Sequence, residues 1–178
     1  MSDLAVARAL VAEFERRVLV EGVDRLERCL ELLSEEDVWW RPNEASNSAG
    51  NLVLHLEGNV RQWILTGLGG QPDERQRSRE FAARGPIPKA ELLARMRATL
   101  GEVKNVLDGL DLTALAAPRQ VQGFAENGVS ILVHVAEHFS YHVGQVSYLV
   151  KAGKGVDLGY YRGVDLERKG ETMGDRSH

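Results

Sequence analysis

The sequence has little of what marks exported, membrane-spanning or nucleic-acid-binding proteins. Its single cysteine, Cys29, cannot form a disulfide within the chain and fits a reducing cytoplasm. No uninterrupted apolar run reaches the roughly 20 residues of a membrane span, and the first residues do not form a signal peptide. The net charge is −4, with arginines scattered among acidic residues. We therefore expect a cytoplasmic protein without membrane or nucleic-acid partners.

Histidine is also scarce, yet three of the five histidines recur at four-residue intervals within one mostly apolar segment. His134, His138 and His142 lie in the segment 131–150. Residues four apart share a face of an α-helix, so His138 and His142 can direct their imidazoles at one point. Each buried imidazole needs a polar partner, and one shared metal ion satisfies both. The pair therefore predicts two metal ligands, and hydrogen-bonded core histidines are the alternative.

A third ligand has to come from elsewhere in the chain, and His55 is the candidate. It lies in the run 51–63, where apolar residues recur every three or four positions and predict another helix. Asn51, His55 and Asn59 form a polar stripe beside the apolar one, which indicates the wall of a cavity. The remaining histidine, His178, is the last residue, and chain ends are often poorly ordered.

Apolar periodicity predicts four long helices and an all-α fold. The first covers residues 3–33, with one step of five from Phe14 to Leu19 and an interruption at Gly22. The second carries His55 as far as residue 68, the third begins after Pro88, and the fourth covers residues 128–152. Residues 71–87, which are mostly polar and charged, and residues 111–127 are predicted connections. An antiparallel four-helix bundle over residues 1–153 follows, with a tail, residues 154–178, that is ordered in part at most.

These residues resemble a known family. One histidine on the second helix, His-x-x-x-His on the fourth and Gly-Gln shortly after are similar to the DinB-like (YfiT-like) superfamily of metal-binding four-helix bundles. The resemblance covers about residues 1–152 and is strongest around His55 and over residues 137–145. It implies a DinB/YfiT-type bundle with longer connections between helices two and three and between three and four. It also implies one divalent metal ion on His55, His138 and His142, with Zn or Ni favoured over Fe, Mn or Co.

A three-histidine site leaves coordination positions open, as catalytic metal sites do, for a water or a thiolate. The resemblance implies a metal-dependent enzyme acting on a small molecule, namely an S-transferase that uses a low-molecular-weight thiol. A metal-dependent hydrolase and a non-catalytic metal- or ligand-binding stress protein are the alternatives. His134-x-x-Glu137-His138 also matches an inverted zinc-protease pattern, but the chain is short and no acidic ligand helix stands out.

A pocket is expected beside the open side of the metal. Its predicted lining is Asn51, Asn59, Trp63, Tyr141 and Gln145. The two asparagines share the face of His55, and Tyr141 and Gln145 border the histidines of the fourth helix. Alternatively, these groups only hydrogen-bond the histidines and the neighbouring helices. In the first connection, Arg75, Arg77 and Arg79 could together bind an anion.

A homodimer is expected for two reasons. The first and third helices carry more apolar positions than one core stripe needs, including Val18, Val20, Ala94 and Val106. The resemblance points the same way, because dimers are frequent among these relatives.

Overall fold

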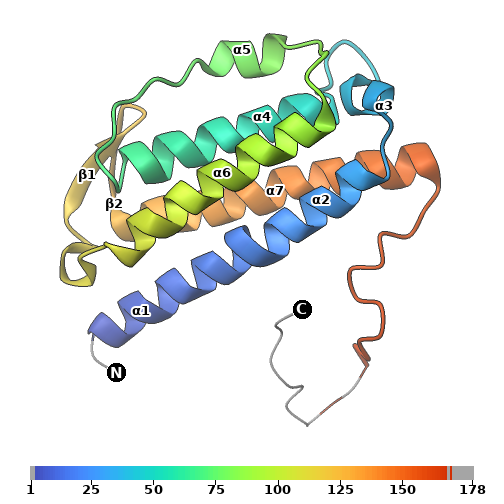
Figure 1. Cartoon of the computed structure of the whole chain (residues 1–178). Helices are drawn as coiled ribbons and strands as arrows, with labels where there is room; N and C mark the ends of the chain where they lie inside the picture. The colour runs from blue at the N-terminus through green and yellow to red at the C-terminus, as the bar shows by residue number, and fades with distance from the viewer. Residues whose placement is uncertain (1–2, 168, 170–178) are drawn as a thin grey trace.

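The computed structural model describes residues 3–167 and 169, and this part of the chain is mainly helical with one small sheet (Figure 1). The first helical rod is continuous and comprises α1 (Asp3–Phe14), the π-helix η1 (Glu15–Gly22) and α2 (Val23–Glu31). After the short α3 (Glu35–Trp39), α4 (Ala49–Val60) continues into the π-helix η2 (Arg61–Thr66). The chain then forms α5 (Arg77–Ala82), α6 (Lys89–Asp108), the short 3-10 helix η3 (Leu112–Ala114), β1 (Pro118–Val121), β2 (Phe124–Asn127) and α7 (Gly128–Lys154).

Helix α4 lies at the centre and packs against α3, α5, α6 and α7. Its pairing with α7 is antiparallel, because His55 faces His138 while Asn59 faces His134. Its pairing with α6 is parallel, because Glu57 meets Arg95 while Arg61 meets Thr99 and Glu102. The chain returns along α4 before α6 begins (Figure 1), so the expected antiparallel order does not hold for this pair.

The step of five in the first apolar stripe marks a change of helix type. Residues Glu15–Gly22 form a π-helix, in which each turn holds more residues than in an α-helix. The buried side of the rod therefore passes through Val18 and then Val23, and Leu19 is only partly buried. Val18, expected at a dimer interface, is fully buried in the core of the same chain, whereas Val20 is exposed.

The connection 111–127 contains a β-hairpin that the sequence analysis does not predict. β1 and β2 are antiparallel, and Val121 pairs with Phe124. Gln122 and Gly123 form the two-residue turn, with φ values of 54° and 83°. Such a turn matches the twist of the paired strands, and here it needs a glutamine in a conformation usually taken by Gly, Asn or Asp. Because Gln122 stands where Gly, Asn or Asp is usual, sequence patterns for turns do not predict this hairpin.

The connection 71–87, which we call the strap, is more ordered than its composition suggests. It contains α5 and runs beside α4 on the side away from the first rod (Figure 1). Two of its charged side chains, those of Arg75 and Glu80, are only 5% and 11% exposed. Asn51, at the start of α4, donates its amide protons to the carbonyl oxygens of Glu80 and Ala83 at 2.8 and 2.9 Å. The strap is therefore fixed to α4 by its backbone as well as by its side chains.

The segment after α7 packs against the first rod. Leu158 is buried, and Arg28 donates to the carbonyl oxygens of Leu158 and Gly159 at 3.0 Å. The Tyr160 hydroxyl lies 2.6 Å from the Ser147 hydroxyl and 3.2 Å from the Cys29 sulfur, and burial raises its pKa to about 12. The end of the predicted tail, including His178, lies outside the described residues. Within the described chain, no helix combines the length and apolar character needed to cross a membrane.

Gly22 tests the packing of the π-helix against α7. A Cβ atom at this position would lie 2.8 Å from the Phe139 ring and 2.8 Å from the Arg17 carbonyl oxygen. We expect Gly22→Ala to lower the free energy of unfolding by about 1–3 kcal/mol, because overpacking costs more than the helix propensity of alanine gains. Gly144→Ala on α7 is the matched control, because a Cβ there meets nothing within 4 Å. Urea denaturation showing equal stability for both variants would contradict this account.

Candidate metal centre

Two helices bring three histidines together. His55 comes from the middle of α4, and His138 and His142 come from successive turns of α7. The Nε2 atoms of His55 and His138 lie 3.2 Å apart. One ring nitrogen from each of the three histidines lies within 4.8 Å of the others, so the group can hold a metal ion. In the described chain, no cysteine or carboxylate joins this group.

Both helices begin at well-defined caps that fix where these histidines lie. Ser48 caps α4, and its hydroxyl accepts from the backbone N–H of Asn51 while the Asn51 side chain bonds back. Asn127 and Ser130 form the same reciprocal arrangement at the start of α7. Each arrangement satisfies backbone donors that a helix start otherwise leaves unpaired. The caps therefore set which turn of each helix carries a histidine.

Hydrogen bonds orient two of the three imidazoles. His55 Nδ1 lies 2.8 Å from a Glu80 carboxylate oxygen, and His142 Nδ1 lies 2.7 Å from Gln145 Oε1. Because both partners are acceptors here, each Nδ1 carries the proton and each Nε2 keeps a free lone pair. This is the tautomer that a metal ligand needs, and an outer hydrogen bond of this kind commonly orients metal-binding histidines.

The spacing of the facing nitrogens fits a shared ion. Two nitrogens bound to tetrahedral zinc at ~2.05 Å lie roughly 3.3 Å apart, close to the separation of His55 and His138 Nε2, 3.2 Å. If His138 ligates through Nε2, its proton is on Nδ1, which is buried and has no partner within the described residues. The geometry therefore fits the ligand set, with one imidazole less firmly oriented than the other two.

Glu80 and Arg75 of the strap contact the histidine cluster, which the sequence analysis did not predict. Arg75 donates from Nε and Nη2 to the two carboxylate oxygens of Glu80 at 2.7 and 2.9 Å. Its Nη2 also lies 3.1 Å from His55 Nδ1. Both nitrogens are donors when His55 Nδ1 carries a proton, so they do not then form a hydrogen bond. A Cβ on Gly58 would lie 2.2 Å from Glu80 Oε1, so the pair needs a glycine beneath it. The polar composition of the strap does not predict these contacts with His55.

The charge states follow from burial and from these bonds. Burial, and then the neighbouring histidines, lower the pKa of His138 to about 3, and burial also lowers the pKa of His134 and His142. Burial alone would raise the pKa of Glu80, but the hydrogen bonds from His55 and Arg75 outweigh it and lower the pKa. At neutral pH, His134, His138 and His142 are thus uncharged, and Glu80 is an anion.

Three of the predicted pocket residues lie near the histidines. Gln145 is bound to His142 in its own helix, as described above. Tyr141 is 59% exposed, and its ring meets that of His142 edge to face at 4.9 Å. Asn59 is 3% exposed, its Nδ2 lies 3.4 Å from His134 Nε2, and its Oδ1 has no partner in the described structure. Asn59 is therefore a buried polar group with unused hydrogen-bonding capacity.

The other two pocket candidates have structural partners. The side chain of Asn51 is fully buried, where it bonds Ser48, Arg41 and the strap. Trp63 stacks on His134 with ring centroids 3.6 Å apart and donates from Nε1 to Gln122 Oε1 at 3.0 Å. The β-hairpin thus holds the ring that covers His134. Glu137 of the rival protease pattern is exposed.

These features define a mainly helical protein in which α4 and α7 present a three-histidine cluster, oriented from outside by a carboxylate and an amide. Residues 7–160, well over half of the 178-residue chain, match the family described as "Protein of unknown function (DUF1572)". The chain belongs to this family. No curated protein matches it.

Glu80→Gln tests the role of the strap in metal binding. The substitution keeps the shape of the side chain but removes the charge that accepts from His55 and pairs with Arg75. We expect zinc affinity, measured by competition with a chromophoric chelator, to fall about 10–100-fold. The control is Glu74→Gln, which changes the same charge at an exposed strap position. Equal affinities of the two variants would show that Glu80 does not act on the site.

The lowered histidine pKa values predict how the stability of the metal-free protein depends on pH. The ordinary pKa of 6.5 falls to about 3 for folded His138, so between these values the unfolded chain binds more protons. The free energy of unfolding should therefore fall as the pH is lowered through this window. In His138→Gln the decline should be shallower, because one of these protons is no longer taken up. Parallel urea-denaturation profiles of the two proteins in a chelator would contradict the assignment.

Proposed function

We propose that this protein is a metal-dependent enzyme of the DinB-like superfamily that transfers a group to or from a low-molecular-weight thiol. The observation that carries the proposal is the ligand set, in which three histidines converge and no further protein ligand is found among the described residues. Such a set leaves positions for an exchangeable ligand, whereas structural zinc sites are closed by four protein ligands. The order of α4, the strap, α6 and α7 is compatible with a DinB/YfiT-type bundle.

His55, His138 and His142 would hold one divalent ion, with Zn or Ni favoured by the imidazole donors. An ion bound there would lower the pKa of a thiol or a water that takes an open position. The reaction balances as a thiol RSH and an electrophile R′X giving the thioether RSR′ and HX. Neutral histidines suit this task, because a protonated imidazole would not bind the ion.

The protein would supply the remaining polar contacts to the substrate. The unpartnered Oδ1 of Asn59 is buried, so it would accept a hydrogen bond from a substrate N–H or O–H only where substrate binding opens access to it. Trp63 and His134 would provide a flat aromatic surface beside it, held in place by the hairpin. Tyr141, exposed beside His142, can contact the thiol. These groups would position the two reactants relative to each other, which is a major source of rate acceleration.

A metal-dependent hydrolase is the second candidate, because the same donor set would activate a water molecule as readily as a thiol. A non-catalytic metal- or ligand-binding protein would use the same histidines without a substrate pocket. The cytoplasmic location and the homodimer also stay proposals. Because Val18 is buried within the chain, the proposed dimer interface would involve mainly Val20 and Ala94, which are exposed.

Cobalt substitution tests the proposed function. We expect one Co²⁺ per chain and a visible spectrum that changes when bacillithiol, mycothiol or glutathione is added, with a thiolate charge-transfer band. Small carboxylates or azide that perturb the spectrum without any response to thiols would favour the hydrolase instead. The His138→Ala variant should lose stoichiometric cobalt, and full retention would refute the ligand set. A spectrum unchanged by every added ligand would refute an open coordination position and, with it, the enzyme.

A further inference from the structure

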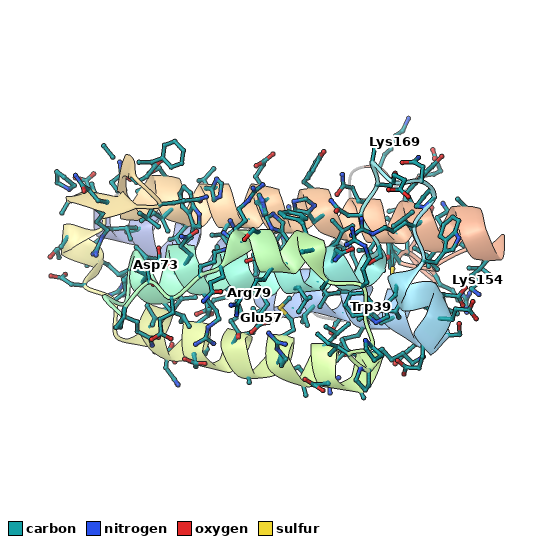
Figure 2. The ribbon with its side chains drawn as sticks, turned by 90° about the horizontal axis from the view of Figure 1, so that it is seen from above. Trp39, Glu57, Asp73, Arg79, Lys154 and Lys169 are labelled. Carbon is teal, nitrogen blue, oxygen red and sulfur yellow. The ribbon has the colours of Figure 1, made fainter. Side chains whose placement is uncertain are left out.

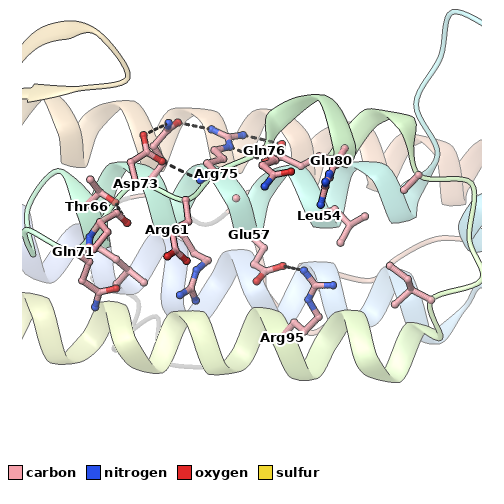
Figure 3. Close-up of a pocket in the computed structure, with 18 residues that line it drawn as sticks. Leu54, Glu57, Arg61, Thr66, Gln71, Asp73, Arg75, Gln76, Glu80 and Arg95 are labelled. Carbon is pink, nitrogen blue, oxygen red and sulfur yellow. Dashed lines mark hydrogen bonds and ion pairs between the residues drawn. The ribbon is translucent and has the colours of Figure 1, made fainter.

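A cavity lies on the other side of the Glu80–Arg75 pair from the histidines. Its volume is about 550 Å³, and its walls are α4 with η2, the strap and the side chain of Arg95 from α6 (Figure 3). This size is typical of small-molecule sites. None of the three clustered histidines lines it, so it is distinct from the candidate metal centre.

Four acidic side chains and four arginines line the cavity, so their formal charges balance. Three of the four acidic side chains already have partners, because Glu57 accepts from Arg95, Asp73 from Gln62, and Glu80 from Arg75 and His55. The fourth, Glu74, is exposed. Glu57 and Glu80 are thus paired with arginines, whereas Asp73 accepts only from neutral groups.

The arginines keep guanidinium N–H groups that donate no hydrogen bond within the described structure. Each guanidinium has five N–H groups. Within the described chain Arg61 pairs with Glu102 through Nη1 alone and Arg95 with Glu57 through Nη2 alone. The guanidinium of Arg79 has no hydrogen-bond or ion-pair partner there. Arg79 and Glu57, both labelled in Figure 2, line this cavity. The guanidinium of Arg79 and the free N–H groups of Arg61 and Arg95 can therefore donate hydrogen bonds to an anion.

A chain of hydrogen bonds runs from this cavity to the histidines. Asp73 accepts from Gln62 at 2.8 Å, Gln62 accepts from Arg75 at 2.9 Å, and Arg75 pairs with Glu80, which accepts from His55. The first four residues all line the cavity (Figure 3). Gly58 leaves room for Glu80 and Arg75 between the cavity and His55.

We propose that this strap cavity binds a small organic anion, and that the bound anion acts on His55 through Arg75 and Glu80. The carboxylate of the ligand accepts from Arg79 and its neighbours and competes with Glu80 for the guanidinium of Arg75. A carboxylate on a short apolar chain is the favoured class, because Leu54, Leu65 and Ile87 contribute apolar wall beside the arginines. The binding step does not depend on the proposed transferase activity.

The test uses the full-length, metal-free protein labelled with ¹⁵N, so that it is independent of any bound ion. Sodium glutarate is titrated at constant ionic strength, and the Nε–H signals of Arg75 and Arg79 and the imidazole nitrogens of His55 are followed by NMR. We expect saturable shifts at all three residues. Inorganic phosphate in a parallel titration should bind more weakly, because it lacks the apolar chain.

Matched variants separate a built site from general attraction of charge. Arg79→Gln should weaken glutarate binding about tenfold or more, the effect of losing a charged hydrogen bond. Arg77→Gln, which makes the same charge change on α5 outside the cavity lining, should leave binding within about twofold. Equal losses in both variants, or no saturable shift with glutarate, would overturn the site.

Two further outcomes would each overturn part of the inference. Tighter binding of phosphate than of glutarate would contradict the carboxylate class. Saturation of the arginine signals without any change at His55 would contradict the link to the histidines. Loss of cobalt binding or of the thiol response leaves these titrations unaffected, so the proposed function and this inference can fail separately.

Discussion

The burial of helix α4 is the constraint on which the candidate site depends. Ten of its twelve residues are buried, and these include Asn51, His55 and Asn59 on one face. A buried polar side chain costs free energy unless it is hydrogen-bonded. The elements around α4 must therefore supply partners. The strap does so for Asn51 and His55, whereas α7 supplies an imidazole to His55 and to Asn59.

The same burial sets the electrostatics of the histidine cluster. Removing imidazoles from water favours their neutral form, which is the form that binds a metal. The buried negative charge of Glu80 is balanced by Arg75 in a two-bond pair, the arrangement that best offsets the loss of solvent. His138 and His142 are thus neutral, and the charged Glu80–Arg75 pair lies on the far side of His55 from them.

Much of the candidate site was predictable because its residues recur at regular spacings within single helices. The four-residue spacing of His138 and His142, the stripe containing His55 and the helix starts can all be read along single helices. Glu80 and Arg75 could not be predicted this way, because they reach His55 across a connection whose composition is that of a solvated loop. Asn51 was predicted to line the pocket from the same helical pattern. It shares the face of His55, but its place at the start of α4 commits it to the cap and the strap.

The long helices were predictable for the same reason. The prediction of the fold failed where the backbone departs from regular patterns. Apolar spacing gave the long helices nearly to their ends. The step of five was visible as an irregularity, but an α-helical reading assigned the core position to Leu19 instead of Val18. The extra residue of a π-helical turn shifts which neighbour faces inward. The hairpin was missed because its turn uses Gln122 at positive φ, a choice that no turn pattern favours.

The anchoring of the strap has a consequence for its length. Surface connections usually accept insertions and deletions because few contacts depend on their register. Here Asp73, Arg75 and Glu80 all reach α4 or η2 with fixed partners, and the carbonyl oxygens of Glu80 and Ala83 are held by Asn51. One residue added between Asp73 and Ala83 would turn at least one of these groups away from its partner. Insertions and deletions should therefore be confined to the few residues before Asp73, although the whole segment has the composition of a variable loop.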